Sequence, residues 1–289
     1  MATLVCFHAH PDDESITTGG SIARAAEEGH RVVLVVATNG DFGEEPEDLA
    51  DGETLIDRRR AELMRSADVL GIHRVVWLGY KDSGMTGWEQ NADPESFLQA
   101  DLDEAAERLA MVLREEHAQV LTTYDWHGNY GHPDHIKVHT VGHRAADLAG
   151  TPDVFEATMN RDHIARMMSM ADEFGMTPKP PPVDPANQND AAPEGVTDGE
   201  PLRPEDFDPN APADDGNPFG TAEAELTHAV DVSKWVGQKR ASIACHESQV
   251  SDSGFFLQMP EPAFNLGFGT EWFIKRGQEP GLRTGWLFE

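Results

Sequence analysis

Several features that many proteins depend on are scarce or missing in this sequence. There are two cysteines, Cys6 and Cys245, without C-x-x-C spacing, so we expect neither a disulfide framework nor a zinc knuckle. The N-terminus has no basic stretch followed by a long apolar one, and the chain has no run of about 18 apolar residues. These absences predict a soluble, cytoplasmic protein that folds without cross-links.

Basic residues are also few. The chain has 22 Lys and Arg against 52 Asp and Glu, which gives a formal net charge of −30. Such a surface repels the phosphates of nucleic acid and of anionic membranes. We therefore expect a small-molecule partner and neither a nucleic-acid nor a membrane partner, while the oligomeric state stays open.

Alternating strands and helices are the main pattern that the sequence does contain. Its apolar, β-branched runs are continuous, which is typical of parallel strands covered on both faces. No G-x-G-x-x-G follows the first run, so a dinucleotide cofactor is not indicated. The prediction is an α/β fold, a Rossmann-like, mostly parallel sheet with helices on both faces. Strands are expected at 4–7, 31–38, 74–78, 119–123, 154–158 and 225–232, and helices at 19–29, 54–70, 101–117, 136–149, 161–174 and 233–248.

The composition divides the chain into three parts. Residues 1–176 form the predicted α/β catalytic core. Residues 221–289 are expected to complete the same domain and to wall the pocket, with an irregular, aromatic tail from residue 254. Between them, residues 177–220 hold 11 of the 19 prolines and too few large apolar residues to offset the entropy of ordering. This acidic insertion is interpreted as a flexible spacer, with a flap over the site as the alternative.

Ionisable side chains directly follow the first predicted strand. Pro11 makes the break after the strand a rigid turn, which brings His10, Asp12 and Asp13 to the carboxyl edge of the sheet. Imidazole nitrogen and carboxylate oxygen are zinc ligands, and a catalytic zinc needs three of them with a position left for water. We predict His10 and Asp13 as ligands and Asp12 as general base. The competing hypothesis is that the acids cap the helix beginning near Gly19.

The same His-Pro-Asp sequence begins again at His132, after the fourth predicted strand. His135, at its end, is the predicted third zinc ligand. His132 would act as an acid or stabilise the oxyanion, with Asp134 raising its basicity and the Tyr130 hydroxyl directed toward the same centre. An alternative pairs His135 with His139, one helical turn later, as in zincin proteases. We prefer the site formed by the two turns because it gives a role to both adjacent carboxylates, those of Asp12 and Asp13.

These two motifs carry a family resemblance. Ala-His-Pro-Asp-Asp-Glu at 9–14 and Gly-His-Pro-Asp-His at 131–135 resemble the motifs of the LmbE family, the N-acetylglucosaminyl-phosphatidylinositol de-N-acetylases (PIG-L). The resemblance covers nearly all the chain outside 177–220. It is greatest to the bacterial mycothiol branch, with Asp-Ser-Gly-Met at 82–85 and His-Glu-Ser-Gln at 246–249 among the similar segments.

The resemblance implies the roles already predicted from the residues: three zinc ligands, a general base, and a group that stabilises the tetrahedral intermediate and protonates the amine. The zinc ligands would be His10, Asp13 and His135, and the general base would be Asp12. The group that stabilises the intermediate and protonates the amine would be His132, aided by Asp134 and Tyr130. The resemblance adds three positions near sugar or inositol hydroxyls or near the pocket, namely Arg59, Asp82 and His246. The chain departs from the family pattern at Lys81 and in the insertion, where acyl and aglycone preference are expected to be decided.

The function predicted is zinc-dependent hydrolysis of the amide of an N-acylated amino sugar by a metal-activated water. Cleavage of a mycothiol S-conjugate is the nearest alternative. A nucleotide-binding Rossmann protein and a non-catalytic metal-binding module are further ones. The sequence does not decide between zinc and Fe²⁺ in the cell.

Overall fold

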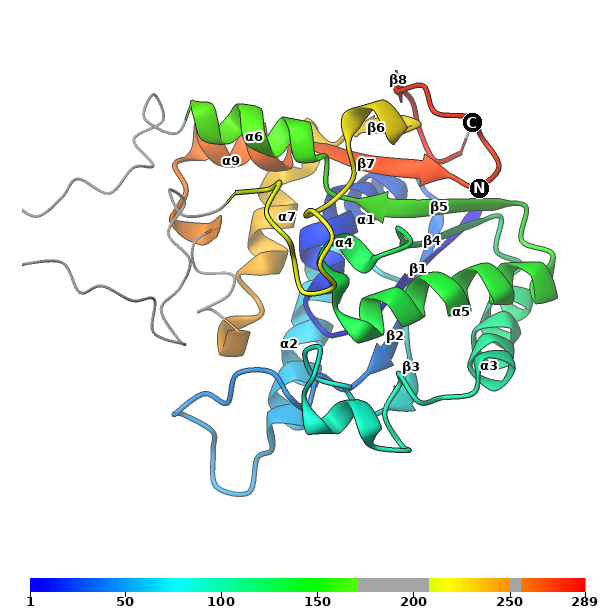
Figure 1. Ribbon diagram of the computed structural model, residues 1–289, viewed down its shortest axis with the longest axis vertical. Coiled ribbons are helices and arrows are strands. Elements are labelled where there is room, and N and C mark those ends of the chain that lie inside the picture. Colours follow the sequence, from blue (N-terminus) through cyan, green and yellow to red (C-terminus); the bar gives the residue numbers. More distant parts are fainter. Residues whose placement is uncertain (171–207, 250–255, 289) are drawn as a thin grey trace, which may run out of the picture.

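The strands of the protein form one sheet (Figure 1). The computed structural model describes residues 1–170, 208–249 and 256–288. The strands are β1 Thr3–His8, β2 Arg31–Thr38, β3 Arg74–Tyr80, β4 Val120–Tyr124, β5 Asp153–Thr158, β6 His228–Asp231, β7 Thr270–Lys275 and β8 Arg283–Thr284. They lie in the order β3-β2-β1-β4-β5-β7-β6-β8. The first five are parallel, while β7 runs antiparallel to both of its neighbours.

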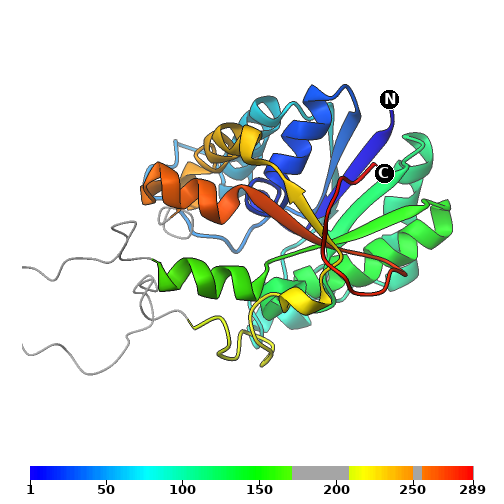
Figure 2. The same ribbon diagram turned by 90° about the horizontal axis from the view of Figure 1, so that it is seen from above.

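Helices cover both faces of this sheet (Figure 2). The α-helices are α1 Gly19–Glu27, α2 Leu55–Leu70, α3 Leu102–Glu115, α4 Gly128–Gly131, α5 Pro133–Ala149, α6 Arg161–Ser169, α7 Val236–Ile243 and α9 Glu261–Phe268. Helices α1, α2 and α7 contact one another on one face, and α3 packs along α5 on the other. The predicted fold class is therefore confirmed. Within the described ranges, no helix combines the length and apolar character that crossing a membrane requires.

The central strand β1 is apolar on both sides because both sides are covered. Val5 and Phe7 join the core under α3 and α5, while Leu4 and Cys6 join the core under α1 and α2. All six residues of β1 are buried. A strand buried on both faces reads as a continuous apolar run, which is why the sequence revealed it.

Local signals fix where the helices near the site begin and end. Helix α2 starts at a capping box in which Thr54 and Asp57 satisfy each other's backbone amides, and it ends at Gly71 with φ of 75°. Helix α5 begins with Pro133, a residue suited to a first helical position because the amide it lacks would have no partner there. The start of α5 is thereby set immediately after His132.

The C-terminal part differs from its prediction. The tail expected to be irregular contains helix α9 and strand β7, and β7 inserts between β5 and β6. Residues 233–248, expected as one helix, contain the short α7 with 3₁₀ turns at Ser233–Trp235 and Glu247–Gln249. The residues of β7, Thr-Glu-Trp-Phe-Ile-Lys, do not alternate between apolar and polar, so the sequence pattern did not indicate this strand.

Glu271 of β7 attaches this late strand to the beginning of the chain. Its carboxylate accepts hydrogen bonds from the backbone amides of Gly20 and Ser21, both at 2.8 Å. Lys239 of α7 donates to the same carboxylate at 2.5 Å. Both side chains involved, Glu271 and Lys239, are buried, so the start of α1 is held by a residue some 250 positions away in sequence.

The end of the predicted insertion packs against the edge of the sheet where β4 ends. Asp214 accepts a hydrogen bond from the amide of Thr86 at 3.0 Å and donates its own amide to the carbonyl of Tyr130. The amide of Gly220 donates to the carbonyl of Asn129 at 2.6 Å. The part of the flexible-spacer prediction that falls on residues 177–207 lies outside the described residues.

Candidate active site

The two His-Pro-Asp turns meet at one edge of the sheet. Strands β1 and β4 are neighbours, and the chain leaves them toward opposite sides, which makes their carboxyl ends a topological switch point where α/β proteins bind ligands. His10 follows β1, and His132 and His135 follow β4. The ring centroid of His10 lies 4.7 Å from that of His132 and 5.3 Å from that of His135.

The three predicted zinc ligands form one compact group. His10 Nδ1 lies 3.4 Å from one carboxylate oxygen of Asp13, and His135 Nε2 lies 3.4 Å from the other. His135 Nδ1 is held by the carbonyl of Gly128 at 3.2 Å, whereas its buried Nε2 has no hydrogen-bond partner among the described residues. A ring fixed at one nitrogen and open at the other is the usual state of a metal-binding histidine. The residues therefore fit a divalent metal.

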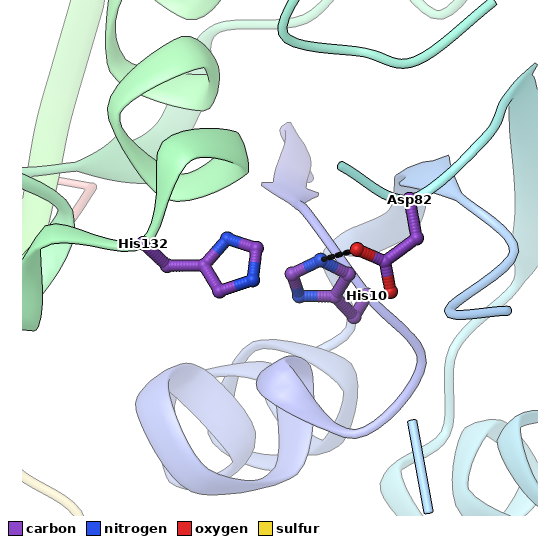
Figure 3. Close-up of side chains that lie close together, drawn as sticks. All are labelled: His10, Asp82 and His132. Atoms are coloured by element: carbon purple, nitrogen blue, oxygen red, sulfur yellow. Dashed lines mark ion pairs between the residues drawn. The ribbon is translucent and has the colours of Figure 1, made fainter. Parts of the chain in front are cut away.

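A second group shares His10 with the first. Figure 3 shows the His10 imidazole lying between Asp82 and His132. His10 Nε2 lies 3.6 Å from Asp82 Oδ1, on the side of the ring away from Asp13. The structure places the buried carboxylate of Asp82 against the predicted ligand, and its expected contact with sugar or inositol hydroxyls stays a prediction.

Asp134 contacts a different histidine from the one predicted. Its carboxylate lies 3.3 Å from His10 Nε2 and accepts hydrogen bonds from the amide and the hydroxyl of Ser83. The ring of His132 instead accepts the backbone amide of Asp134 at 3.1 Å. The expectation that the Asp134 carboxylate raises the basicity of His132 is therefore wrong, because capping α5 turns the His132 ring toward the backbone.

Asp12 sits in an unusual conformation that Arg59 holds. Its φ is 123°, a value rare for residues with a side chain. Arg59 Nη2 donates to the carbonyl of Pro11 at 2.7 Å and to Asp12 Oδ2 at 2.9 Å, while Nη1 donates to the carbonyl of Gly40 at 2.7 Å. A Cβ on Gly40 would lie 2.4 Å from the guanidinium, so glycine is required there. Arg59 is buried and contacts the predicted base; its expected contact with substrate stays a prediction.

Burial and neighbouring charges shift the pKa values of these two adjacent carboxylates in opposite directions. Burial raises the pKa of Asp12 to about 6, against the lowering effect of Arg59. Burial would also raise the pKa of Asp13, but His135 and His10 outweigh it and hold that pKa well below its usual range. Asp13 is thus suited to bind a cation, and Asp12 to accept a proton near neutral pH.

The histidines divide in the same way. Burial, with His10 and His135 nearby, lowers the pKa of His132 to about 2, and burial also lowers the pKa of His135. Burial would lower the pKa of His10 too, but Asp82, Asp13 and Asp134 hold it well above its usual range. His132 and His135 are therefore neutral at pH 7. His135 Nε2 has a lone pair to offer, whereas the Nδ1 lone pair of His132 already accepts the amide of Asp134.

The ring of Tyr130 lies beside two histidines of the site, and the predicted direction of its hydroxyl toward the metal centre stays a prediction. Its ring centroid is 4.9 Å from that of His135 and 6.2 Å from that of His132. On its other side it stacks on Phe219, at the end of the insertion. Gly131, with φ of 91°, lets that segment approach closely, because a Cβ there would lie 2.4 Å from the backbone of Asp215.

His246 is buried behind the first turn. Its Nε2 lies 2.8 Å from Glu14 Oε1, and Glu14 also accepts a hydrogen bond from Ser66. Burial would lower the pKa of His246, but Glu14, followed by Asp12, raises it. His246 therefore contacts the residue two places after Asp12, and its predicted place near the pocket stays a prediction.

Ser83 and Glu14 are site residues to which the sequence analysis gave no role. Ser83 stands between two residues of a segment that resembles the family, and that position was its only signal. Glu14 ends the first motif, and its Oε2 accepts the backbone amide of Asp12 at 3.0 Å. Both hold a neighbour of the metal group in place, a function that leaves little trace in residue type.

Two alternatives from the sequence are excluded by these contacts. The acids of the first turn do not cap α1, because its amides are taken by Glu271, and Asp13 Oδ2 accepts the amide of His10 instead. Among the described residues His139 does not group with His135, because its ligand atoms lie with those of His143 and Glu156, whereas His135 groups with His10 and Asp13.

Comparison with known proteins connects this site to an enzyme family. Residues 5–146 match the family described as GlcNAc-PI de-N-acetylase (PIG-L). The chain is 37% identical to a 1D-myo-inositol 2-acetamido-2-deoxy-alpha-D-glucopyranoside deacetylase of Thermobispora bispora, over 97% of this chain and 90% of that relative.

Solved structures share the fold at lower identity. The N,N'-diacetylchitobiose deacetylase of Pyrococcus horikoshii has a TM-score of 0.52 at 20% identity, covering 94% of this chain and 83% of that one. GalB, the 4-carboxy-2-hydroxymuconate hydratase of Pseudomonas putida KT2440, has a TM-score of 0.54 at 17% identity, covering 99% and 100%. A deacetylase and a hydratase therefore share this architecture, and the fold alone does not identify the reaction.

Proposed function

Since this chain belongs to the GlcNAc-PI de-N-acetylase family, we propose that it removes the acetyl group from an N-acetylglucosamine joined to inositol, with zinc bound by His10, Asp13 and His135. The chain is an enzyme of the deacetylase class, which hydrolyses amides. The substrate is proposed from the relative's printed activity, since that relative matches nearly the whole chain. A cytoplasmic location belongs to the same proposal.

The observation that carries the proposal is the pairing of a metal-binding group with a separate carboxylate. His10, Asp13 and His135 bring their ligand atoms within 4.8 Å of one another, and Asp12 is adjacent in sequence but held elsewhere by Arg59. A divalent metal in that group would lower the pKa of water and polarise an amide carbonyl. A metal-storage module has no use for a positioned base beside the metal.

The chain's own residues would supply the proton transfers. Asp12, with its raised pKa, would accept a proton from the attacking water. His132, neutral and close to His10, would donate a hydrogen bond to the developing oxyanion, and Tyr130 would assist from the other side. The amine would then leave with the proton returned by Asp12. Each oxyanion donor of this kind contributes about 3 to 4 kcal/mol in enzymes where it has been removed.

Amine release from a small panel of substrates tests the proposal. The purified full chain, with its zinc and iron content measured, would be assayed on N-acetylglucosaminyl-inositol, N-acetylglucosamine, diacetylchitobiose and a mycothiol S-conjugate. We expect the inositol glycoside to give the highest kcat/KM, with acetate formed in equal amount. A higher kcat/KM on the S-conjugate would reject the proposed substrate, and absence of amine from all four with the metal site filled would reject deacetylation of these glycosides.

A further inference from the structure

A second cluster of metal-ligating side chains lies outside the active site. His139 and His143 stand one turn apart on α5, and Glu156 lies on β5. Their ligand atoms lie within 4.8 Å of one another, and all three residues are partly exposed. Because side chains alternate along a strand, Glu156 projects to the same face of the sheet as Val154, which packs in the core under α5.

The hydrogen bonds of the two rings leave suitable atoms available. His139 Nδ1 is bonded to the carbonyl of Tyr124 at 3.0 Å, so its proton lies there and Nε2 has the lone pair. His143 Nε2 lies 2.9 Å from Glu156 Oε1 but makes no hydrogen bond to it or to any other described residue. The ring centroids of the two histidines are 4.4 Å apart.

We propose that His139, His143 and Glu156 form a second divalent-metal site, which takes Zn²⁺. Two imidazoles one helical turn apart and a carboxylate are a ligand set that zinc accepts, with a fourth position open to water. Tetrahedral zinc with ligand bonds of about 2.0 to 2.1 Å holds neighbouring ligand atoms roughly 3.3 Å apart, close to the spacing of His143 and Glu156.

The charges around the cluster permit a cation. Arg276 donates to the backbone carbonyl of His143 at 3.5 Å, but its charge is paired with Asp147 at 2.9 Å. Lys275 is paired with Asp153 at 2.6 Å. The ion would therefore meet the carboxylate of Glu156 without an unpaired cation beside it.

The ion would act as a clamp. It would join α5, whose first turn carries His135, to β5 of the sheet, and His139 is already attached to β4 through Tyr124. The ring of Tyr124 packs against His135 with centroids 4.7 Å apart. Metal at this cluster would thus stiffen the support of the active site without touching its ligands.

Zinc stoichiometry of the full chain tests this site independently of activity. The protein would be loaded with excess ZnCl₂, passed through a desalting column, and analysed for zinc and protein content. We expect two zinc ions per chain in the wild type. His143→Ala and Glu156→Gln should each retain one ion, at the active site, and His135→Ala should retain one, at the second site. The His135→Ala/Glu156→Gln double variant should retain none. His117→Asn, which changes an exposed histidine and keeps a residue that tolerates its φ of 49°, should retain two.

Loss of folding is separated from loss of the ion by the second variant and by circular dichroism. Glu156→Gln keeps the shape of the side chain, so it should fold even if His143→Ala does not. The proposal would be overturned by one zinc ion in the folded wild type, or by two in folded Glu156→Gln. The latter result would mean that His143 and Glu156 form only an ion pair.

Discussion

The two turns at the active site contain the same three residue types in the same order, yet they fold and act differently. In the first, Asp12 follows Pro11 with φ of 123° and is held by Arg59. In the second, Asp134 follows Pro133 in the first turn of α5 and is fully buried against Ser83 and His10. The difference arises because the second turn begins a long α-helix, whereas the first leads into a single π-helical turn at Glu14–Thr18.

The comparison shows that an identical motif does not specify the role of its carboxylate. Asp12 retains a partly exposed side chain and a raised pKa, as a proton acceptor requires. Asp134 has no exposure and instead orients His10, a predicted ligand. We therefore infer that one aspartate acts on substrate and the other on the metal group, and substitutions can separate the two.

Replacement of Asp12 should have the largest effect. In Asp12→Ala we expect kcat to fall by about 10²- to 10⁴-fold, the usual contribution of a general base, with zinc content unchanged. Amine-release kinetics and metal analysis on the same sample measure both. If zinc were lost instead, the carboxylate of Asp12 would belong to the metal group, and the distinction between the turns would fail.

Replacement of Asp134 should act first on the metal. Removing the charge that supports His10 in Asp134→Asn should weaken zinc binding by about 10- to 100-fold, as for other residues behind metal ligands. Competition with a chromophoric chelator gives the affinity, and excess zinc should restore much of the activity. Unchanged affinity with a low kcat would show that Asp134 acts like Asp12.

Arg59 sharpens the comparison because its hydrogen bonds reach the first turn and the carbonyl of Gly40, but not the second turn. If it positions Asp12, Arg59→Gln should lower kcat by about tenfold and leave KM nearly unchanged, since the lost interaction serves the transition state. A raised KM with normal kcat would support the substrate-binding role expected from the family resemblance. Arg60→Gln is the matched control, because Arg60 is exposed and its guanidinium lies over Trp77.

Glu116, at the opposite edge of the sheet, is the contrasting case of a carboxylate used for stability. Arg31 and Arg74 bind it, and the Arg31 hydrogen bond lowers its pKa from 4.5 to about 2 against the effect of burial. The stabilisation is fully present above pH 4.5 and is lost as the pH falls from 4.5 to about 2.

Glu116→Gln should therefore lower the free energy of unfolding by about 1 to 2 kcal/mol at pH 7 and leave kcat unchanged. The difference from wild type should shrink through the same pH range, as measured by urea denaturation. Glu115→Gln, at a more exposed neighbour, should change stability by less than about 0.5 kcal/mol. A constant difference down to pH 2 would contradict the assignment.

The parts of the fold that the sequence revealed are those governed by local pattern. The runs at β1 and β2 are buried on both faces, so their apolar continuity identified them, and Gly71 marked the end of α2. Strand β7 was missed because it pairs with β5 and β6, partners distant in sequence, and its residues carry no alternation strong enough to indicate a strand.

The site shows the same limit. Proximity of the two turns followed from strand ends meeting at one sheet edge, so His10 and His135 could be paired from sequence alone. The contacts of Asp134 and Arg59 could not be predicted from sequence, because each contact depends on the direction that the side chain takes once the helices have packed. Residue type predicts which chemistry a site can perform, whereas the division of work among its acids needs coordinates.

The attachment of Glu271 to the amides of Gly20 and Ser21 has a consequence for biosynthesis. A nascent chain that has emerged only as far as α9 already contains both turns, but the helix behind the first of them still lacks the carboxylate that holds its start. We expect ribosome-bound chains truncated before β7 to remain sensitive to protease around residue 20. Metal capture would then follow the pairing of β7 with the rest of the sheet.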